Sequence, residues 1–203
     1  MKRMVDLFSG LGGASESMLN NGWEVLRIEQ NAELSLVPNT QIMSVEDFGK
    51  EVEKHIKQGY NFEQPNLIWA SPPCTDFSDG FFSPKSKAGR AGEYYDPQEA
   101  IELVKETKRI IDMINPQYYI IENVRGAIKY LTPILGEPSL IIDSIVLWGR
   151  FPIWAMPPDY KHIKADPWSK DPLRANKRAL IPYAVSDACR QSIEHTKTLD
   201  YWF

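Results

Sequence analysis

A pair of prolines directly before a cysteine constrains this chain more than any other feature. The apolar run at residues 67–70 predicts a short buried strand, and Ser71-Pro72-Pro73-Cys74 follows it. Because proline fixes φ and has no backbone N–H for a neighbouring strand, the strand must end at Ala70 or Ser71. Cys74 therefore lies on a stiff turn at the carboxyl end of a strand, the edge where open α/β sheets bind ligands. A thiol held there is a candidate nucleophile, and an inert buried cysteine is the alternative.

Two other segments combine an apolar strand with groups that suit a binding site. Residues 5–13, VDLFSGLGG, lead from a strand through a glycine-rich turn into a helix, an arrangement that cradles nucleotide-like ligands. Glu16 and Ser17 occupy the later positions of the dinucleotide fingerprint, which argues against a dinucleotide. Residues 118–124, YYIIENV, place Glu122 at the end of an apolar strand, where an unpaired charge is costly and rarely structural.

The motifs DLFSGLGG, PPCTDFS and ENV, in this order and at these separations, resemble the cytosine-C5 DNA methyltransferase family. The resemblance is close over about residues 4–130 and loose over residues 139–195. Only about thirty residues separate Arg150 from the last expected helix, so the chain resembles a short phage- or prophage-type member without a full target-recognition domain. The family implies that S-adenosylmethionine donates a methyl group to C5 of a cytosine flipped out of double-stranded DNA, with S-adenosylhomocysteine as product.

The resemblance assigns catalytic roles to Cys74, Glu122 and Arg150. C5 of cytosine is a poor nucleophile until a thiolate adds to C6 and turns the ring into an enamine, and Cys74 would supply that thiolate. Glu122 would hold a proton for N3 of the ring, which apolar neighbours favour. Arg150 would replace the arginines of the family's Q-x-R-x-R segment, which this sequence lacks. The sequence does not identify the base that removes the C5 proton, and a bound water is one candidate.

The resemblance also implies which residues bind S-adenosylmethionine. Glu29 would hold the ribose hydroxyls, and Asp47 would face the adenine, with Glu46 an equally good match at that position. The full set lies in the glycine-rich turn, in the two acidic segments that contain Glu29 and Asp47, and in the proline pair. It comprises Phe8, Ser9, Gly10, Leu11, Gly12, Gly13, Glu29, Gln30, Asp47, Phe48 and Pro73. No metal is expected, because Cys74 and Cys189 are far apart in the sequence and form no CxxC motif.

Alternating strand and helix patterns predict an α/β fold with a mostly parallel sheet and helices on both faces. The expected strands are residues 4–8, 24–28, 67–70, 118–122 and 141–147 with a short one near Ile153, and the expected helices are residues 13–21, 45–58, 97–114 and 182–195. The last two strands would form an antiparallel hairpin around Trp148-Gly149-Arg150. The family implies a Rossmann-like S-adenosylmethionine-dependent methyltransferase fold, with residues 1–203 as a single catalytic domain.

Two stretches are candidates for contact with DNA. Residues 79–96 interrupt the pattern, and we expect a mobile catalytic loop without regular structure that closes over DNA, as in the family; an ordinary surface loop is the alternative. The residues suited to phosphates or to stacking are Ser78, Phe81, Phe82, Lys85, Lys87 and Arg90. Residues 150–181 would form a reduced target-recognition segment, because residues 150–180 hold seven Lys and Arg against three Asp, a local charge of +4.

Composition narrows the remaining classes of function. A net charge of −4 is not the footprint of a strong non-specific nucleic-acid binder. The sequence shows no apolar run that could span a membrane and no signal-peptide pattern, so we expect a cytoplasmic protein of a bacterium or a phage-infected host, as in restriction-modification. An RNA (tRNA) cytosine-5 methyltransferase, an enzyme that prepares a base for further modification, and a non-catalytic cofactor- or DNA-binding protein stay open. A partner subunit or a homo-oligomer would supply the missing recognition region.

Overall fold

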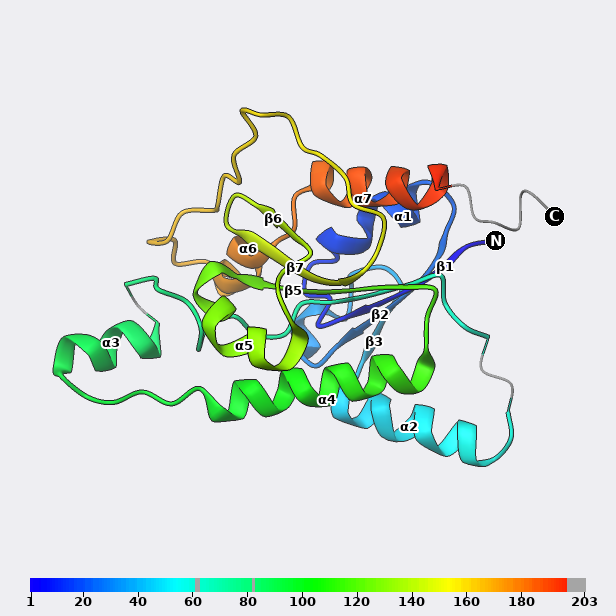
Figure 1. Ribbon diagram of the computed structural model, residues 1–203, viewed down its shortest axis with the longest axis horizontal. Coiled ribbons are helices and arrows are strands. Elements are labelled where there is room, and N and C mark those ends of the chain that lie inside the picture. Colours follow the sequence, from blue (N-terminus) through cyan, green and yellow to red (C-terminus); the bar gives the residue numbers. More distant parts are fainter. Residues whose placement is uncertain (61–62, 82, 197–203) are drawn as a thin grey trace.

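A single mixed sheet organises the chain in the computed structural model, which describes residues 1–60, 63–81 and 83–196. Within these residues seven strands lie in the order β3-β2-β1-β4-β5-β7-β6 (Figure 1). Their bounds are β1 Arg3–Leu7, β2 Glu24–Glu29, β3 Thr40–Ile42, β4 Leu67–Ala70, β5 Tyr118–Val124, β6 Leu140–Ile142 and β7 Ile145–Arg150. β1 pairs in parallel with β2 and β4, β2 with β3, and β4 with β5, whereas β7 is antiparallel to β5 and β6. The predicted α/β fold, a mostly parallel sheet with an antiparallel C-terminal hairpin, is confirmed.

Helices cover both faces of this sheet because the strands bury side chains on both faces. Along β1, Met4 belongs to one apolar cluster and Val5 to the other, as the alternation of a strand requires. α2 (Val45–Lys57) and α4 (Gln98–Ile114) cover one face, and α1 (Glu16–Asn20) and α7 (Tyr183–His195) cover the other (Figure 1). All four residues of β4 are buried, so the strand that leads to Cys74 lies in the centre of the core.

The C-terminal hairpin turns at a different place from the one predicted. Its turn is Asp143-Ser144, between β6 and β7, so the stretch 141–147 that we expected as one strand is divided in two. Trp148-Gly149-Arg150 is the end of β7, and Ile153 is in no strand and largely exposed. The physical reason is the polar Asp-Ser pair inside an apolar run, with Asp143 at a φ of 50°, a conformation that Asp tolerates in turns.

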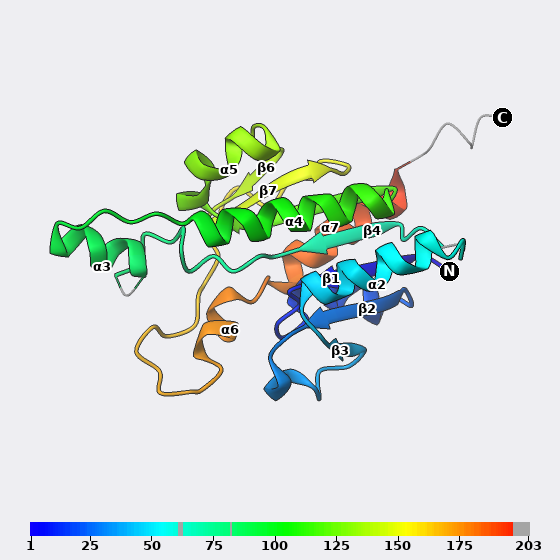
Figure 2. The same cartoon turned by 90° about the horizontal axis from the view of Figure 1, so that it is seen from below.

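The stretch expected to lack regular structure, residues 79–96, contains a helix instead. α3 (Pro84–Ala91) begins where the Ser83 hydroxyl accepts a hydrogen bond from the Ser86 N–H, and it ends at Gly92 in the left-handed conformation. Serine before the helix, proline in its first turn and glycine after it are the usual helix boundaries. α3 extends away from the sheet at one end of the molecule (Figure 2).

Three further elements are absent from the sequence prediction: β3, α5 (Ile128–Leu135) and α6 (Arg174–Ala179). α5 packs with α4 and β7 around a third apolar cluster that includes Val104, Leu131 and Trp148. Its proline at position 133 conceals the helical pattern. Among the residues that the structure describes, none of the helices has the length and apolar character needed to cross a membrane.

Candidate active site

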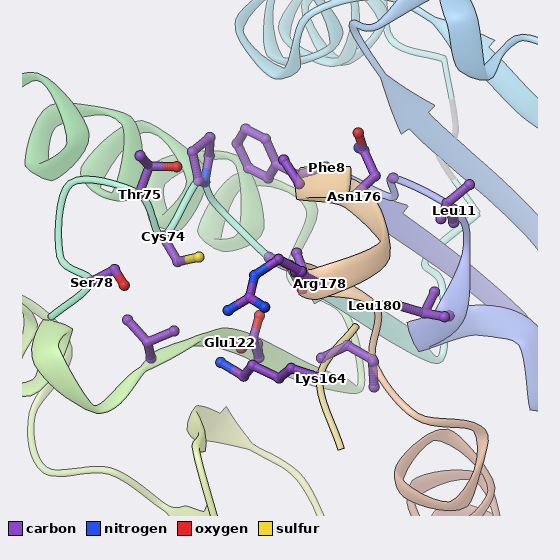
Figure 3. A pocket seen from close by; sticks show the side chains of 18 of the residues that line it. Phe8, Leu11, Cys74, Thr75, Ser78, Glu122, Lys164, Asn176, Arg178 and Leu180 are labelled. Atoms are coloured by element: carbon purple, nitrogen blue, oxygen red, sulfur yellow. The ribbon is translucent and has the colours of Figure 1, made fainter. Parts of the chain in front are cut away.

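The carboxyl ends of β1, β4 and β5 open into a cavity of about 680 Å³ (Figure 3). The glycine-rich turn follows β1, the proline pair and Cys74 follow β4, and Glu122 lies in the second half of β5. Because these parallel strands are neighbours in the sheet, their ends bring the three sequence motifs to one place. The volume is in the range of small-molecule sites in proteins.

Hydrogen bonds fix the turn that carries Cys74. The Cys74 carbonyl accepts from the N–H groups of Phe77 at 3.1 Å and Ser78 at 3.0 Å. The buried side-chain amide of Asn123 donates to the Pro72 carbonyl at 3.1 Å and so ties β5 to the proline pair. The Cys74 sulfur points into the cavity (Figure 3).

Burial controls the protonation of both reactive groups. It raises the pKa of Cys74 to about 11, the negative charge of Glu122 adds to the rise, and the positive charge of Lys164 opposes it. Burial also raises the pKa of Glu122 to about 7, against a hydrogen bond with Ser71 and the charge of Lys164. A carboxyl group with that pKa is protonated in part of the molecules at neutral pH, so Glu122 can donate a proton to a ligand.

Glu29 joins the glycine-rich turn to the end of β2. Its buried carboxylate accepts from the N–H groups of Gly10 at 2.9 Å and Asn31 at 2.8 Å. Phe8, also at the cavity, has a φ of 57°, which is uncommon for a residue other than glycine. An aromatic side chain and a carboxylate at the same cavity suit the base and the ribose of a nucleoside.

Two buried side-chain oxygens at the cavity, Asp6 Oδ1 and Ser9 Oγ, have no hydrogen-bond partner in the described part of the chain. The other carboxylate oxygen of Asp6 accepts from the Ser15 hydroxyl at 2.6 Å, and burial raises the pKa of Asp6 to about 7. A buried polar atom without a partner is costly. These two oxygens therefore suit the polar groups of a ligand.

Gly12 and Gly13 are required for packing within the protein, because a side chain at either position would clash with its neighbours. A Cβ on Gly12 would lie 2.5 Å from Cζ of the buried Arg27, and a Cβ on Gly13 would lie 2.4 Å from the Ile181 carbonyl oxygen. Gly10 differs, because its Cβ would have Asn176 Nδ2 as nearest atom at 3.7 Å. Of the three glycines, Gly10 has the free space that a ligand could use.

Most of the residues that the sequence implied line this cavity. They are Phe8, Ser9, Gly10, Leu11, Gly13, Glu29, Gln30, Pro73, Cys74, Ser78, Phe81 and Glu122. Others lie outside it: Gly12, Asp47, Phe48, Lys85, Lys87, Arg90 and Arg150. Phe82 lies outside the described residues. Asp47 is exposed in the first turn of α2 and pairs with Lys50 at 2.7 Å, while Phe48 is buried in the core.

Arg150 lies at the other end of the sheet from Cys74. In the β5–β7 pairing Arg150 is opposite Tyr119, whereas Glu122 is opposite Leu147. The Arg150 guanidinium donates to the carbonyls of Pro116 at 2.7 Å and Gln117 at 3.2 Å. These contacts hold the start of β5, so the structure does not bring Arg150 to the reactive groups.

Cations from a later part of the chain lie at the cavity instead. Figure 3 shows Lys164 and Arg178 beside Glu122, with Asn176 near Phe8. The local charge of residues 150–181 was the available signal, but it did not indicate which cations face the cavity. The sequence could not indicate that Lys164 faces the cavity, because residues 151–173 contain no regular helix or strand and so have no periodic pattern.

No group of three or more His, Cys, Asp or Glu side chains in the described part of the chain could hold a metal ion. The lining of the cavity offers a thiol, carboxyl groups, cations and aromatic side chains.

A family model described as C-5 cytosine-specific DNA methylase matches residues 2–131. The chain is similar to Type II methyltransferase M.HindV of Haemophilus influenzae, with 29% identity over 124 residues that cover 60% of this chain and 37% of that protein. It is similar to Type II methyltransferase M1.HphI of Haemophilus parahaemolyticus, with 25% identity over 59% of this chain and 32% of that protein. For Type II methyltransferase M.HgiGI of Herpetosiphon aurantiacus the identity is 27%, over 62% of this chain and 92% of that protein. The chain thus spans about a third of the length of the first two relatives.

Among solved structures, the chain is similar to a putative DNA modification methyltransferase encoded within an E. coli prophage, with 17% identity and a TM-score of 0.48. The match covers 73% of this chain and 46% of that one. A methyltransferase from Agrobacterium tumefaciens, described as SAM-dependent, gives 13% identity and a TM-score of 0.43, over 73% of this chain and 55% of that one.

Proposed function

The chain belongs to the C-5 cytosine-specific DNA methylase family, and from this premise we propose that it transfers a methyl group from S-adenosylmethionine to C5 of cytosine in DNA. The observation that carries the proposal is the meeting of Cys74 and Glu122, from neighbouring strands, at one cavity that the glycine-rich turn also lines. A nucleophile and a proton donor on the same cavity are the two groups that addition to a pyrimidine needs.

The side chains that line the cavity suit each part of S-adenosylmethionine. Phe8 offers an aromatic side chain for the adenine, Glu29 a carboxylate for the ribose, and the unpartnered oxygens of Asp6 and Ser9 suit the amino-acid part. When bound, S-adenosylmethionine supplies an electrophilic methyl group. Asp47 and Phe48 lie outside the cavity, so this proposal gives the adenine to Phe8 and Gln30 instead.

The chain's own residues carry the covalent chemistry. The Cys74 thiolate forms a bond to C6, the C5=C6 electron pair moves into the ring, and Glu122 gives its proton to N3. C5 is then the nucleophilic carbon of an enamine. Contacts within the protein set the positions of both reactive groups. The turn from Pro72 to Ser78 positions the sulfur of Cys74, and β5 positions the carboxyl group of Glu122.

DNA is the proposed substrate, with the target cytosine flipped out of the duplex, because Cys74 lies inside a cavity that a stacked base cannot reach. Residues 79–96 and 150–181 provide the contacts outside the cavity. With so few side chains for base edges, we expect a target of about two to four base pairs. A long, exact target would point to a partner subunit or a second copy of the chain.

The test is a methyl-transfer assay with labelled S-adenosylmethionine and separate pools of DNA and tRNA, followed by mapping of any methylated base. Label at C5 of cytosine in DNA supports the proposal, and label only in tRNA contradicts it. Cys74→Ser should lose all detectable transfer while it retains cofactor binding in calorimetry. Cys189→Ala is the matched control, because Cys189 lies in the core and outside the cavity.

A further inference from the structure

Residues 162–165 are held against the cavity at two points. At one end, the backbone N–H of His162 donates to Asp143 Oδ2 at 2.9 Å, and the His162 ring nitrogen lies 3.2 Å from Ser144 Oγ. At the other end, Arg178 of α6 donates to the Ala165 carbonyl at 2.5 Å. The hairpin turn and α6 therefore fix a stretch of chain that has no helix or strand of its own.

Lys164 stands between these two points and lines the cavity. Its charge acts on both reactive groups, Cys74 and Glu122. Its amino group is directed toward Glu122 in Figure 3. In the described part of the chain, the salt bridges do not include Lys164, so its ammonium group is available to a ligand.

The proposed reaction moves one negative charge through the space beside Lys164. The charge begins on the Cys74 sulfur. When the S–C6 bond forms, the C5=C6 electron pair shifts toward C4 and the C4=N3 pair moves to N3, where it is shared with O2 through C2. When Glu122 gives its proton to N3, the charge ends on the Glu122 carboxylate. A cation near both ends of this path, on a stretch of backbone held at His162 and Ala165, stabilises the charge of the transition state.

We propose that Lys164 is a further catalytic residue of this chain, whose ammonium group contacts the exocyclic carbonyl oxygen O2 of the cytosine and stabilises the negative charge that passes from Cys74 to Glu122. This inference rests on the proposed function. It goes beyond it by giving a defined chemical role to one residue of the 150–181 segment.

Other charged groups around Cys74 set the background for this effect. Glu122 from β5 and Asp76 from the same turn both raise the pKa of the Cys74 thiol, and Lys164 lowers it. The remaining titratable groups that line the cavity are Asp6, Glu29, His162, Arg174 and Arg178. Removal of the Lys164 charge would leave Cys74 facing two carboxyl groups, so a smaller fraction of the thiol would ionise at a given pH.

The experiment compares Lys164→Met, which removes the charge, with Lys164→Arg, which keeps it. Lys161→Met is the matched control, because Lys161 is an exposed lysine of the same segment and does not line the cavity. The first readout is the rate of alkylation by iodoacetamide as a function of pH in the protein without DNA. It reports on Cys74, since Cys189 is fully buried. The second readout is single-turnover methyl transfer at saturating DNA and S-adenosylmethionine.

We expect Lys164→Met to move the alkylation profile to higher pH and to slow single-turnover transfer about 10- to 100-fold, with recovery in Lys164→Arg and wild-type behaviour in Lys161→Met. An alkylation profile and a transfer rate both equal to wild type would overturn the inference. If DNA affinity in fluorescence anisotropy is then the only property lost, Lys164 is a phosphate contact. A wild-type protein without methyl transfer would overturn the proposed function instead, and the alkylation profile would still decide whether Lys164 acts on Cys74.

Discussion

At Cys74 and Glu122 the same apolar surroundings act on two acids, and burial moves the pKa of both upward, to about 11 and about 7. The consequences are opposite. For Glu122 the shift is useful, because the protonated form can serve N3 near neutral pH. For Cys74 the shift opposes the thiolate, so a positive charge must return part of the lost acidity. Lys164 is the cation placed to do so.

Glu122 provides a prediction that needs no substrate. Because its folded pKa is above the usual value, the folded protein binds more protons than the unfolded chain between about pH 4.5 and 7, and stability is lost as pH rises through the folded pKa. Glu122→Gln removes this loss. The variant should be more stable than wild type by less than about 1 kcal/mol at pH 5 and by up to about 3 kcal/mol at pH 8.5.

The same variant should transfer methyl groups about 10²- to 10⁴-fold more slowly, because an amide cannot give up a proton to N3. Urea unfolding at the two pH values and single-turnover assays measure these effects. Asp6 titrates in the same range but is present in both proteins, so the difference between them isolates Glu122. An equal stability at pH 8.5, with transfer within a few-fold of wild type, would contradict an acid role.

At the scale of elements, the glycine-rich turn has two separate roles, one in folding and one in ligand binding. Gly12 packs against Arg27, whose guanidinium donates to the Ser15 hydroxyl at 2.8 Å and to the Gly12 carbonyl at 3.1 Å. A Cβ on Gly10 would meet no clash, with Asn176 Nδ2 at 3.7 Å as its nearest atom, and Gly10 lines the cavity. The sequence pattern treats these glycines as equivalent, whereas the structure separates a folding role from a ligand role.

Alanine at each position tests this separation. Both glycines have positive φ, 52° and 79°, so both variants carry backbone strain, but only Gly12→Ala also forces Arg27 to move. We expect a cost of about 1 kcal/mol for Gly10→Ala and about 3 kcal/mol for Gly12→Ala. Gly10→Ala should weaken S-adenosylmethionine binding more than it weakens the fold. Urea unfolding and calorimetry measure the two effects, and equal losses of stability would disprove the division of roles.

For the whole molecule, the cavity is bordered by two parts of the chain that are far apart in sequence. Gly80, Phe81 and Ser83 line it before α3, and residues 162–181 line it from the other side. α3 and α6 lie toward the same end of the molecule (Figure 2). In the proposed function, DNA that delivers a base to Cys74 would therefore pass both parts.

The cations of α3 are not equivalent in this arrangement. Lys85 pairs with Asp79 and donates to the Phe77 carbonyl at 3.5 Å, so it holds α3 to the turn after Cys74. Arg90 Cζ lies 3.9 Å from the centroid of the Phe81 ring, and Lys87 is exposed on the same helix. We therefore expect Lys87 and Arg90, rather than Lys85, to contact phosphates.

Replacing Lys87 and Arg90 together with alanine should weaken DNA binding and reduce the slope of affinity against salt by about 1 to 2. The methylated site should stay the same. Fluorescence anisotropy with labelled DNA at several salt concentrations measures the slope. Lys54→Ala with Lys57→Ala is the matched control, because this pair removes the same charge from α2, away from the cavity. A control that weakens DNA binding as strongly would show a general charge effect.

The sequence alone determined the parts of this protein that depend on neighbouring residues. Apolar runs gave β1, β4 and β5, the proline pair ended β4 at the right place, and the order of the motifs indicated a parallel sheet whose carboxyl edge holds Cys74 and Glu122. Such features depend on φ restrictions and on strand burial, which a few consecutive residues specify. The helix α3 was also specified locally, by Ser83, Pro84 and Gly92, although the prediction treated the segment as irregular.

Only the tertiary structure decided which cation reaches the site. Arg150 matched the expected sequence position, but its strand runs antiparallel, so its side chain lies at the far end of β5. Lys164 is in a stretch with no periodic pattern, and its place depends on contacts of His162 with Asp143 and of Ala165 with Arg178. Contacts of this kind join residues that are distant in sequence, and no local rule of propensity or spacing specifies them.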